Sequence, residues 1–228
     1  LSENNIVTIQ PDSLRILHNP LTGWVLYASM GVDAADFWAQ YDHMYIPELG
    51  HNVSVTDYAH TLYIRASWTD FNPQEDVYGW KIDSNLRAYI EGAYQRNMRL
   101  AFRVVVDSRD KRTEFTKFVK ALAKDFNDPS KVEFIDGFGL GKWGEYHTMI
   151  YSTGDDTPKK AVFNWVTDIY SQAFDKVPVV INYHRWIGAG KDWVDDEHFA
   201  ADSEEMLEEA IKKGYSLRHD AFGMTTYY

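Results

Sequence analysis

The chain has 228 residues, of which 45% are hydrophobic and 25% are charged, enough for one large domain with a sizeable core. These globular values exclude a disordered or low-complexity chain. The formal net charge of -11 at pH 7 argues against a nucleic-acid binder and against a polybasic membrane-surface protein. It favours neutral or cationic partners, and we predict no nucleic-acid partner.

The sequence contains no cysteine, which excludes disulfides, thiolate metal sites and a cysteine nucleophile. No stretch approaches the roughly 18 consecutive apolar residues of a membrane span, so no transmembrane segment is predicted. The first residues lack the basic and apolar regions of a signal peptide. We therefore expect a secreted, periplasmic or cell-surface protein whose signal has been removed, or otherwise a cytoplasmic one.

Aromatic residues are abundant: 8 Trp, 15 Tyr and 12 Phe make up 15% of the chain. Large side chains dominate protein cores, so most of these rings are expected to fill the core. Trp and Tyr also join an apolar face to a polar edge, which suits stacking on sugar rings. The composition therefore favours a carbohydrate ligand for a few of them.

Short β-rich runs alternate with helical patterns along the chain, which is typical of βα units around a parallel sheet. Six strands are predicted, at 23–28, 61–68, 99–106, 132–140, 178–183 and 215–222. Apolar stripes or capping signals predict helices over 82–93, 115–126, 157–174 and 202–214. The long segment 30–58 is expected to contain a first helix and a loop on the catalytic face.

This succession gives either an open doubly wound sheet or a closed (βα)8 TIM barrel. No nucleotide-binding glycine motif follows a strand, since the glycines of 137–141 lead into Trp143 with no Lys-Ser/Thr pair. The barrel is therefore favoured. A closed barrel has eight units and about 250 residues, whereas about six units are counted here. We expect residues 1–228 to be a single barrel domain that is incomplete at its C-terminus.

Working residues of parallel α/β folds lie at the carboxyl ends of the strands. Glu145 is the leading catalytic candidate, because its aromatic neighbours in sequence would raise its pKa toward use as a general acid. Asp107 and Asp220 are candidates for the second carboxylate, or else for salt bridges with nearby Arg residues. The predicted substrate-binding residues are Arg65, Trp68, Arg103, Trp143, His147, Asn182, His184, Trp186, Arg218 and His219.

Three of these residues are histidines that could bind a metal together with Asp220. No H-x-H or H-E-x-x-H spacing accompanies them, and histidines that bond ligand hydroxyls or carboxylates are the favoured interpretation. No G-x-S-x-G motif indicates a serine nucleophile. We predict no metal and no cofactor.

Residues 64–83 (IRASWTDFNPQEDVYGWKID) resemble the second βα unit of retaining glycoside hydrolases of the β-galactosidase and cellulase clan. The resemblance implies a (βα)8 barrel whose general acid/base is a Glu ending the fourth strand, a position that Glu145 matches by strand order. The clan usually has Asn before this Glu, where this chain has Gly144. The clan's nucleophile is a Glu ending the seventh strand, and the pattern here ends after the sixth.

Three further segments resemble a less-characterised bacterial family of glycoside-hydrolase-like barrels, described as a domain of unknown function. They are 19–24 (NPLTGW), 139–147 (GLGKWGEYH) and 217–222 (LRHDAF), of which W-G-E-Y-H is the most specific. This resemblance also implies a barrel and a carbohydrate substrate.

The leading hypothesis is a glycosidase in which Glu145 is the acid/base and Arg65 and Arg103 orient a carboxylate. In it Trp68, Trp143 and Trp186 stack on sugar rings. One alternative is a non-catalytic carbohydrate-binding barrel, suggested by Gly144 and by the missing seventh-strand nucleophile. Another is a metal-dependent hydrolase that uses His147, His184 and Asp220.

Overall fold

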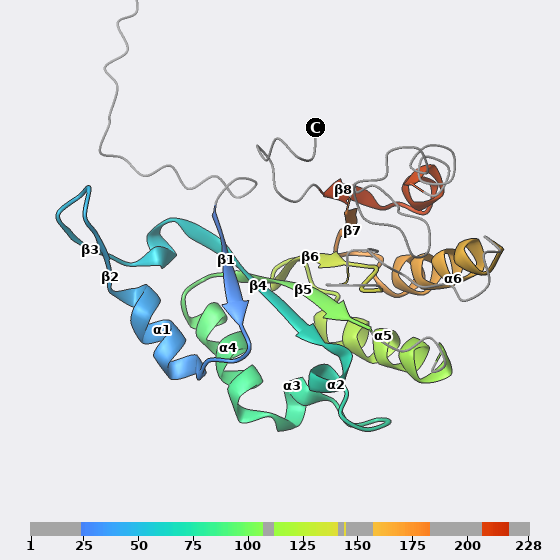
Figure 1. Cartoon of the computed structure of the whole chain (residues 1–228), viewed down its shortest axis with the longest axis horizontal. Helices are drawn as coiled ribbons and strands as arrows, with labels where there is room; N and C mark the ends of the chain where they lie inside the picture. Colours follow the sequence, from blue (N-terminus) through green and yellow to red (C-terminus); the bar gives the residue numbers. More distant parts are fainter. Residues whose placement is uncertain (1–23, 107–111, 141–143, 145–156, 183–206, 219–228) are drawn as a thin grey trace, which may run out of the picture.

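A parallel sheet of six strands is the centre of the molecule (Figure 1). A computed structural model describes residues 24–106, 112–140, 144, 157–182 and 207–218, and all statements about structure refer to these residues. The strand order is β1-β4-β5-β6-β7-β8, and every neighbouring pair is parallel. The strands are β1 (Trp24–Ser29), β4 (Ala59–Ser67), β5 (Arg99–Val105), β6 (Val132–Asp136), β7 (Val179–Asn182) and β8 (Ser216–Arg218). They confirm the six predicted strands and the barrel-type βα order.

The two faces of this sheet differ because successive side chains of a strand point to opposite sides. On β4, Leu62, Ile64 and Ala66 belong to the buried apolar core. Tyr63 and Arg65, which alternate with them, point to the other face, here called the inner face. The same alternation holds on β5, where Leu100, Phe102 and Val104 are core residues and Arg103 faces inward.

Three long helices supply the other half of the core: α4 (Ser84–Gln95), α5 (Arg112–Phe126) and α6 (Thr157–Ala173). The apolar stripe predicted for α5 is buried along its whole length, from Phe115 to Phe126. Asp83 caps α4 by accepting a hydrogen bond from the Leu86 N–H at 2.8 Å. The predicted helices are confirmed, except that the one predicted from Ile82 begins at Ser84, because Ile82 ends a separate short helix and is exposed. Residues 207–212 are the described part of the last predicted helix.

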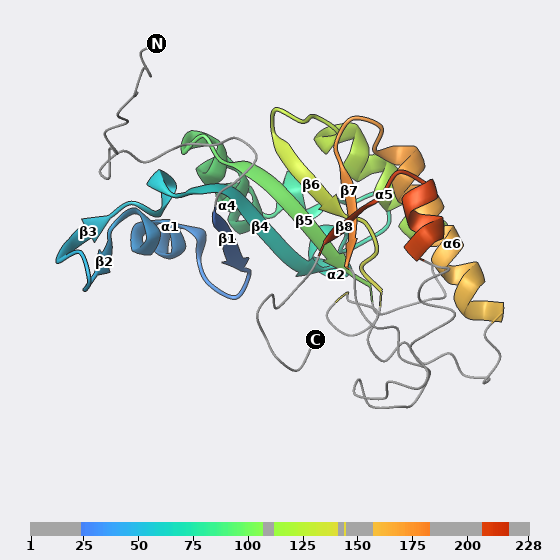
Figure 2. The ribbon, with the colours of Figure 1, turned by 90° about the horizontal axis from the view of Figure 1, so that it is seen from above.

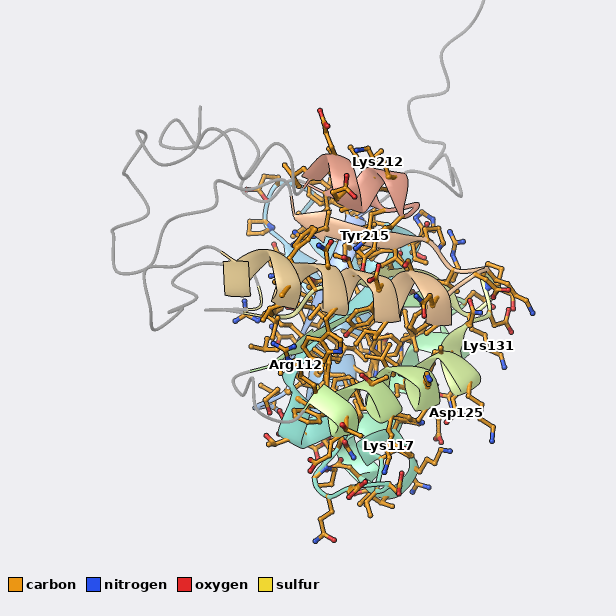
Figure 3. The ribbon with its side chains drawn as sticks, turned by 90° about the vertical axis from the view of Figure 1, so that its right-hand side faces the viewer. Arg112, Lys117, Asp125, Lys131, Lys212 and Tyr215 are labelled. Carbon is orange, nitrogen blue, oxygen red and sulfur yellow. The ribbon has the colours of Figure 1, made fainter. Side chains whose placement is uncertain are left out.

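Helices α5 and α6 lie side by side over the sheet (Figure 3). Phe115 of α5 meets Trp165 of α6 edge to face, with ring centroids 5.8 Å apart. Lys117 and Asp125 lie on the side of α5 away from α6, where they pair with Glu75 and Lys81 respectively. The helix layer is therefore apolar toward the sheet and charged toward solvent.

The segment between β1 and β4 contains the predicted helix, α1 (Ala34–Asp42), which packs on α4. The loop that follows the carboxyl end of β1 is short, 30–33, and does not account for the length of the segment. The extra length lies after α1, as an antiparallel hairpin of β2 (Met44–Ile46) and β3 (His51–Val53) followed by η1 (Val55–Asp57). An insertion between a helix and the next strand lies at the amino ends of the strands, opposite the catalytic end. Figure 2 shows this hairpin projecting on the side of the molecule far from α6.

The segment after β4 is short and tightly bonded. It forms α2 (Trp68–Phe71) and α3 (Gly79–Ile82). Ser67 and Asp70 make a capping box at the start of α2, in which each residue bonds the other's backbone N–H. Trp80 of α3 donates its indole N–H to Asp125 of α5 at 2.8 Å. This unit is thus anchored to the helix layer. None of the helices in the described ranges is long and apolar enough to cross a membrane.

Candidate functional site

Charged side chains meet on the inner face near the carboxyl ends of three neighbouring strands. Arg65 of β4 is in register with Arg103 of β5, which is in register with Asp136 of β6. Arg218 joins them from β8. We call Arg65, Arg103, Asp136 and Arg218 the strand-end layer. The carboxyl ends of parallel strands are where barrel enzymes place their active sites.

Asp136 is the centre of this layer and is only 1% exposed. Its Oδ2 accepts hydrogen bonds from Arg103 Nε at 2.8 Å and from the Tyr63 hydroxyl at 3.0 Å. The same oxygen lies 2.8 Å from Nη2 of Arg218. A buried carboxylate needs such donors, because burial without partners would cost several kcal/mol. Asp136 therefore holds side chains of β4, β5 and β8 in one place.

Tyr63 acts in this layer as a neutral hydrogen-bond donor. Burial and the nearby negative charge of Asp136 raise the pKa of its phenol far above the usual value. The hydroxyl therefore keeps its proton at any physiological pH and donates it toward Asp136. The guanidinium carbon of Arg103 also lies 5.6 Å from the centre of the Tyr63 ring, which adds a cation–π contact.

Arg65 is in a different situation from Arg103. Its side chain is partly buried, and its guanidinium carbon lies 5.8 Å from the centre of the Tyr27 ring. Within the described residues it forms no ion pair and no side-chain hydrogen bond. Tyr27 itself is 47% exposed, so this part of the inner face is open to solvent between described residues.

In the segment after β6, the position of Gly139 is packed too closely for a side chain. A Cβ on Gly139 would stand 1.9 Å from the Val104 carbonyl oxygen, and Gly139 has a φ of +73°. Gly139 also accepts a hydrogen bond from the Val106 N–H at 2.8 Å, so this segment continues the sheet beside β5. Gly139 therefore has a packing role, which explains this glycine without a phosphate ligand.

Gly144, the residue before Glu145, is buried against Arg103. Its φ is +73°, and a Cβ there would lie 3.2 Å from Cδ of Arg103 and 3.3 Å from the carbonyl oxygen of Gly139. Asn tolerates a positive φ, but its larger side chain would have to displace Arg103 or the backbone of Gly139. This crowding gives a physical reason why Gly, and not the clan's Asn, stands at position 144.

Five of the predicted site residues lie among the described residues. Arg103 and Arg218 meet at Asp136, and Arg65 stands beside them in register. Asn182 is the last residue of β7 and is in register with Arg218. The remaining predictions, Glu145, Asp107, Asp220, Trp143, His147, His184, Trp186 and His219, lie outside the described residues.

Trp68 has a different position from the one predicted. It is 8% exposed, and its ring meets Phe115 of α5 edge to face at 5.4 Å. It thus packs between sheet and helix, on the opposite side from the strand-end layer, and its place gives no support to stacking on a sugar. The reason is local: side chains alternate along β4, and Trp68 continues the series Leu62, Ile64 and Ala66 that faces the helices.

Asp136 and Tyr63 are the residues that sequence reasoning missed. A signal for Asp136 existed, because a carboxylate ends the otherwise mostly apolar run Val132–Asp136, at the strand end where functional residues are expected. Tyr63 carried no comparable signal, because Tyr is common in strands. Within the described ranges, no three His, Asp or Glu side chains gather as metal ligands would.

Comparison with solved structures identifies the fold. CbXyn10B in native form matches with a TM-score of 0.53 at 12% identity, over 89% of this chain and 60% of that chain. An endo-glycoceramidase II from Rhodococcus sp. and another glycoside hydrolase match at 11% and 10% identity, over 84% and 87% of this chain and 60% and 76% of theirs, each with a TM-score of 0.43. No protein-family model matches the sequence, and no curated protein does.

Of these three structures, CbXyn10B has a TM-score above 0.5, and at 12% identity the similarity concerns the fold alone. The chain spans 60% of the length of CbXyn10B. Together with the six-stranded parallel sheet, it shows a fold of the TIM-barrel class.

Proposed function

We propose that this protein is a glycosidase that acts on an oligo- or polysaccharide by carboxylate acid/base catalysis. The observation that carries the proposal is the strand-end layer, in which a 1% exposed Asp136 and a 2% exposed Arg103 are joined at the catalytic end of a barrel sheet. Keeping two charges out of water there costs several kcal/mol, so the layer is maintained at an energetic penalty that a simple core would avoid. The likeness of the fold to glycoside hydrolases supports the same reading.

In this proposal Glu145 is the general acid/base. Gly144, the residue that precedes Glu145 in the sequence, packs on Arg103 of the strand-end layer. The acid would protonate the glycosidic oxygen as the bond to the leaving sugar breaks. A second carboxylate, Asp107 or Asp220, would act as nucleophile or as base toward water. Asp107 directly follows Val106, which bridges to Leu140, and Asp220 follows two residues after β8.

Within the proposal, Asp136 is a positioning residue. Two hydrogen-bond donors and the Arg218 guanidinium already surround its Oδ2, which leaves this oxygen no free role as nucleophile. Its part is to fix Arg103 and Arg218 at the strand ends. Trp143, Trp186, His147, His184 and His219 stay predicted sugar-binding residues.

The test is Glu145→Gln, which keeps the shape of the side chain and removes the acid. We expect turnover of a cleaved glycan to fall by a factor of about 10² to 10⁴, with the affinity for that glycan largely retained. Glu91→Gln, an exposed change on α4, is the matched control and should leave turnover as it is. Unchanged turnover in the Glu145 variant would rule out the proposed role.

A non-catalytic carbohydrate-binding barrel is the second candidate, and Gly144 favours it. The clan's Asn before the acid/base is replaced here by a residue whose surroundings leave little room for any side chain. Binding on a glycan array without release of reducing sugar, by the full-length protein, would support this candidate over the first. Metal-dependent hydrolysis through His147, His184 and Asp220 stays a third prediction, which metal analysis of the purified protein would decide.

A further inference from the structure

Arg103 is enclosed by protein, with only 2% of its surface exposed. Its Nε donates to Oδ2 of Asp136 at 2.8 Å, and its guanidinium carbon lies 5.6 Å from the centre of the Tyr63 ring. A carboxylate on one side and an aromatic ring on another hold the guanidinium in place. A side chain so enclosed does not reach a bound sugar, so any effect of Arg103 on catalysis passes through its neighbours.

One of these neighbours is residue 144. A Cβ on Gly144 would stand 3.2 Å from Cδ of Arg103, and 3.3 Å from both Cα and the carbonyl oxygen of Gly139. The carbonyl of Gly139 is itself held, because it accepts a hydrogen bond from the Val106 N–H at 2.8 Å. The backbone of Gly144 is therefore enclosed between the aliphatic stem of Arg103 and a fixed segment of main chain.

This enclosure bears on catalysis because Glu145 is the next residue in the sequence. Consecutive Cα atoms lie about 3.8 Å apart across a trans peptide, so a shift of residue 144 is passed to residue 145. A general acid must lie within hydrogen-bond reach of the oxygen that it protonates, and a misplacement of about 1 Å can lower the rate by about 10². Whatever fixes the backbone at position 144 thus also limits where the carboxyl group of Glu145 can lie.

We propose that Arg103 is a positioning residue, which fixes Glu145 for proton transfer by packing against the backbone of Gly144. This inference rests on the proposed function, since it concerns the acid/base of the same site. It gives Arg103 a role in the rate of the reaction, in place of the contact with the sugar that the sequence predicts. It also gives the buried ion pair a purpose, because Asp136 holds the guanidinium and with it the stem that contacts Gly144.

The first test places a methyl group in this contact. Gly144→Ala in the full-length protein should displace Arg103 by a few tenths of an ångström and lower kcat about 10-fold, with KM unchanged. Gly50→Ala is the matched control, because Gly50 has nearly the same φ, +69° against +73°, and open space at its Cβ position. It carries the same backbone strain, and its kcat should equal that of the wild type. The assay is release of reducing sugar from β-linked hexaoses of glucose, xylose, mannose and galactose.

The second test changes Arg103 itself. Arg103→Ala should lower kcat by about 10² and leave KM within about threefold, because the side chain acts on Glu145 and makes no contact with the sugar. Arg103→Lys keeps Cδ and a positive charge for Asp136, so it should recover most of the lost kcat. Urea unfolding of each variant shows whether it is folded under the assay conditions. If Arg103→Ala does not fold, Arg103→Lys and Gly144→Ala decide the inference.

A double variant tests the contact directly. In Arg103→Ala the Cδ that crowds position 144 is absent, so adding Gly144→Ala should lower kcat by at most about threefold more. Losses that multiply in full would overturn the inference, as would wild-type kcat in Gly144→Ala. A raised KM with normal kcat in Arg103→Ala would also overturn it and would assign Arg103 to substrate binding. Each of these results leaves the proposed function standing, whereas a wild-type protein that cleaves none of the hexaoses contradicts both.

Discussion

The two faces of the parallel sheet both bury side chains, apolar ones on one face and charged ones on the other. The face toward α4, α5 and α6 is filled by aliphatic and aromatic side chains, with Leu62, Leu100 and Phe102 fully buried. The inner face buries Arg103 and Asp136 to nearly the same extent. Apolar packing stabilises in proportion to the area removed from water, whereas the charged layer is stable only while each partner is present.

Strand β4 shows this contrast between adjacent residues. Leu62 and Tyr63 are both buried, yet Leu62 contributes by filling space and Tyr63 by donating one hydrogen bond to Asp136. The comparison teaches that burial alone does not mark a core residue here. The charged side chains of the inner face lie one residue away from the core of the fold. The first three of the changes below test that separation, and the fourth compares it with an ion pair outside the sheet.

The largest effect is expected for Asp136→Ala. The change leaves the buried Arg103 and the partly buried Arg218 without their shared carboxylate, which should cost about 3–5 kcal/mol in the free energy of unfolding. Urea denaturation measures it. Glu133→Ala is the matched control, because its partner Arg99 lies at the other, more exposed end of the face and the loss should be about 1 kcal/mol or less. Equal losses in the two variants would mean that the ion pairs of the strand-end layer contribute no more to stability than the more exposed Arg99–Glu133 pair.

Leu62→Ala tests the helix-covered face of the sheet, at the residue of β4 that precedes Tyr63. A fully buried Leu loses its transfer free energy and leaves a cavity, so we expect a loss of about 3 kcal/mol in unfolding free energy. Leu49→Ala, at an exposed position beside the hairpin, should change stability by at most about 0.5 kcal/mol. Glycan binding, measured below the unfolding transition, should be the same in both variants, whereas Asp136→Ala should lose it.

Tyr63→Phe removes only the hydroxyl from the charged layer. Its hydrogen bond to a carboxylate should be worth about 2 kcal/mol, since bonds to charged groups are stronger than neutral ones. Tyr45→Phe on the exposed hairpin is the control and should be near neutral. A near-neutral Tyr63→Phe would show that Arg103 and Arg218 satisfy Asp136 without it.

Asp42→Asn examines an ion pair outside the sheet and should give the smallest effect. Arg96 bonds the Asp42 carboxylate from α4, at 2.7 Å through Nε, and this hydrogen bond lowers the carboxyl pKa although burial opposes the shift. Both side chains are partly exposed, so the pair should contribute about 1 kcal/mol.

The pH dependence of this pair follows from the lowered pKa. The folded state binds a proton at Asp42 less readily than the unfolded state, so the contribution is complete above the ordinary pKa near 4 and is lost as the pH falls further. Unfolding of the wild-type protein and of Asp42→Asn should therefore differ at pH 7 and converge toward pH 3. A constant difference over that range would contradict the assignment.

The sequence by itself determined the order of elements, because strand and helix periodicities are local properties of the chain. All six strands and the main helices fall where the alternation and the apolar stripes place them, and Arg65, Arg103 and Arg218 were identified from strand ends alone. The extra length before β4 was misplaced, because nothing local shows at which end of a sheet an insertion lies.

Only the tertiary structure decided which strand-end residues work together. The union of Tyr63, Arg103 and Arg218 at Asp136 spans up to 155 positions between Tyr63 and Arg218, and no short pattern reports contacts at that separation. The structure also places Trp68 in the core, against Phe115. It shows that Arg103 lies close to position 144, which favours glycine there. The physical reason is that register and packing between strands, which are set by the whole sheet, choose the partner of each side chain.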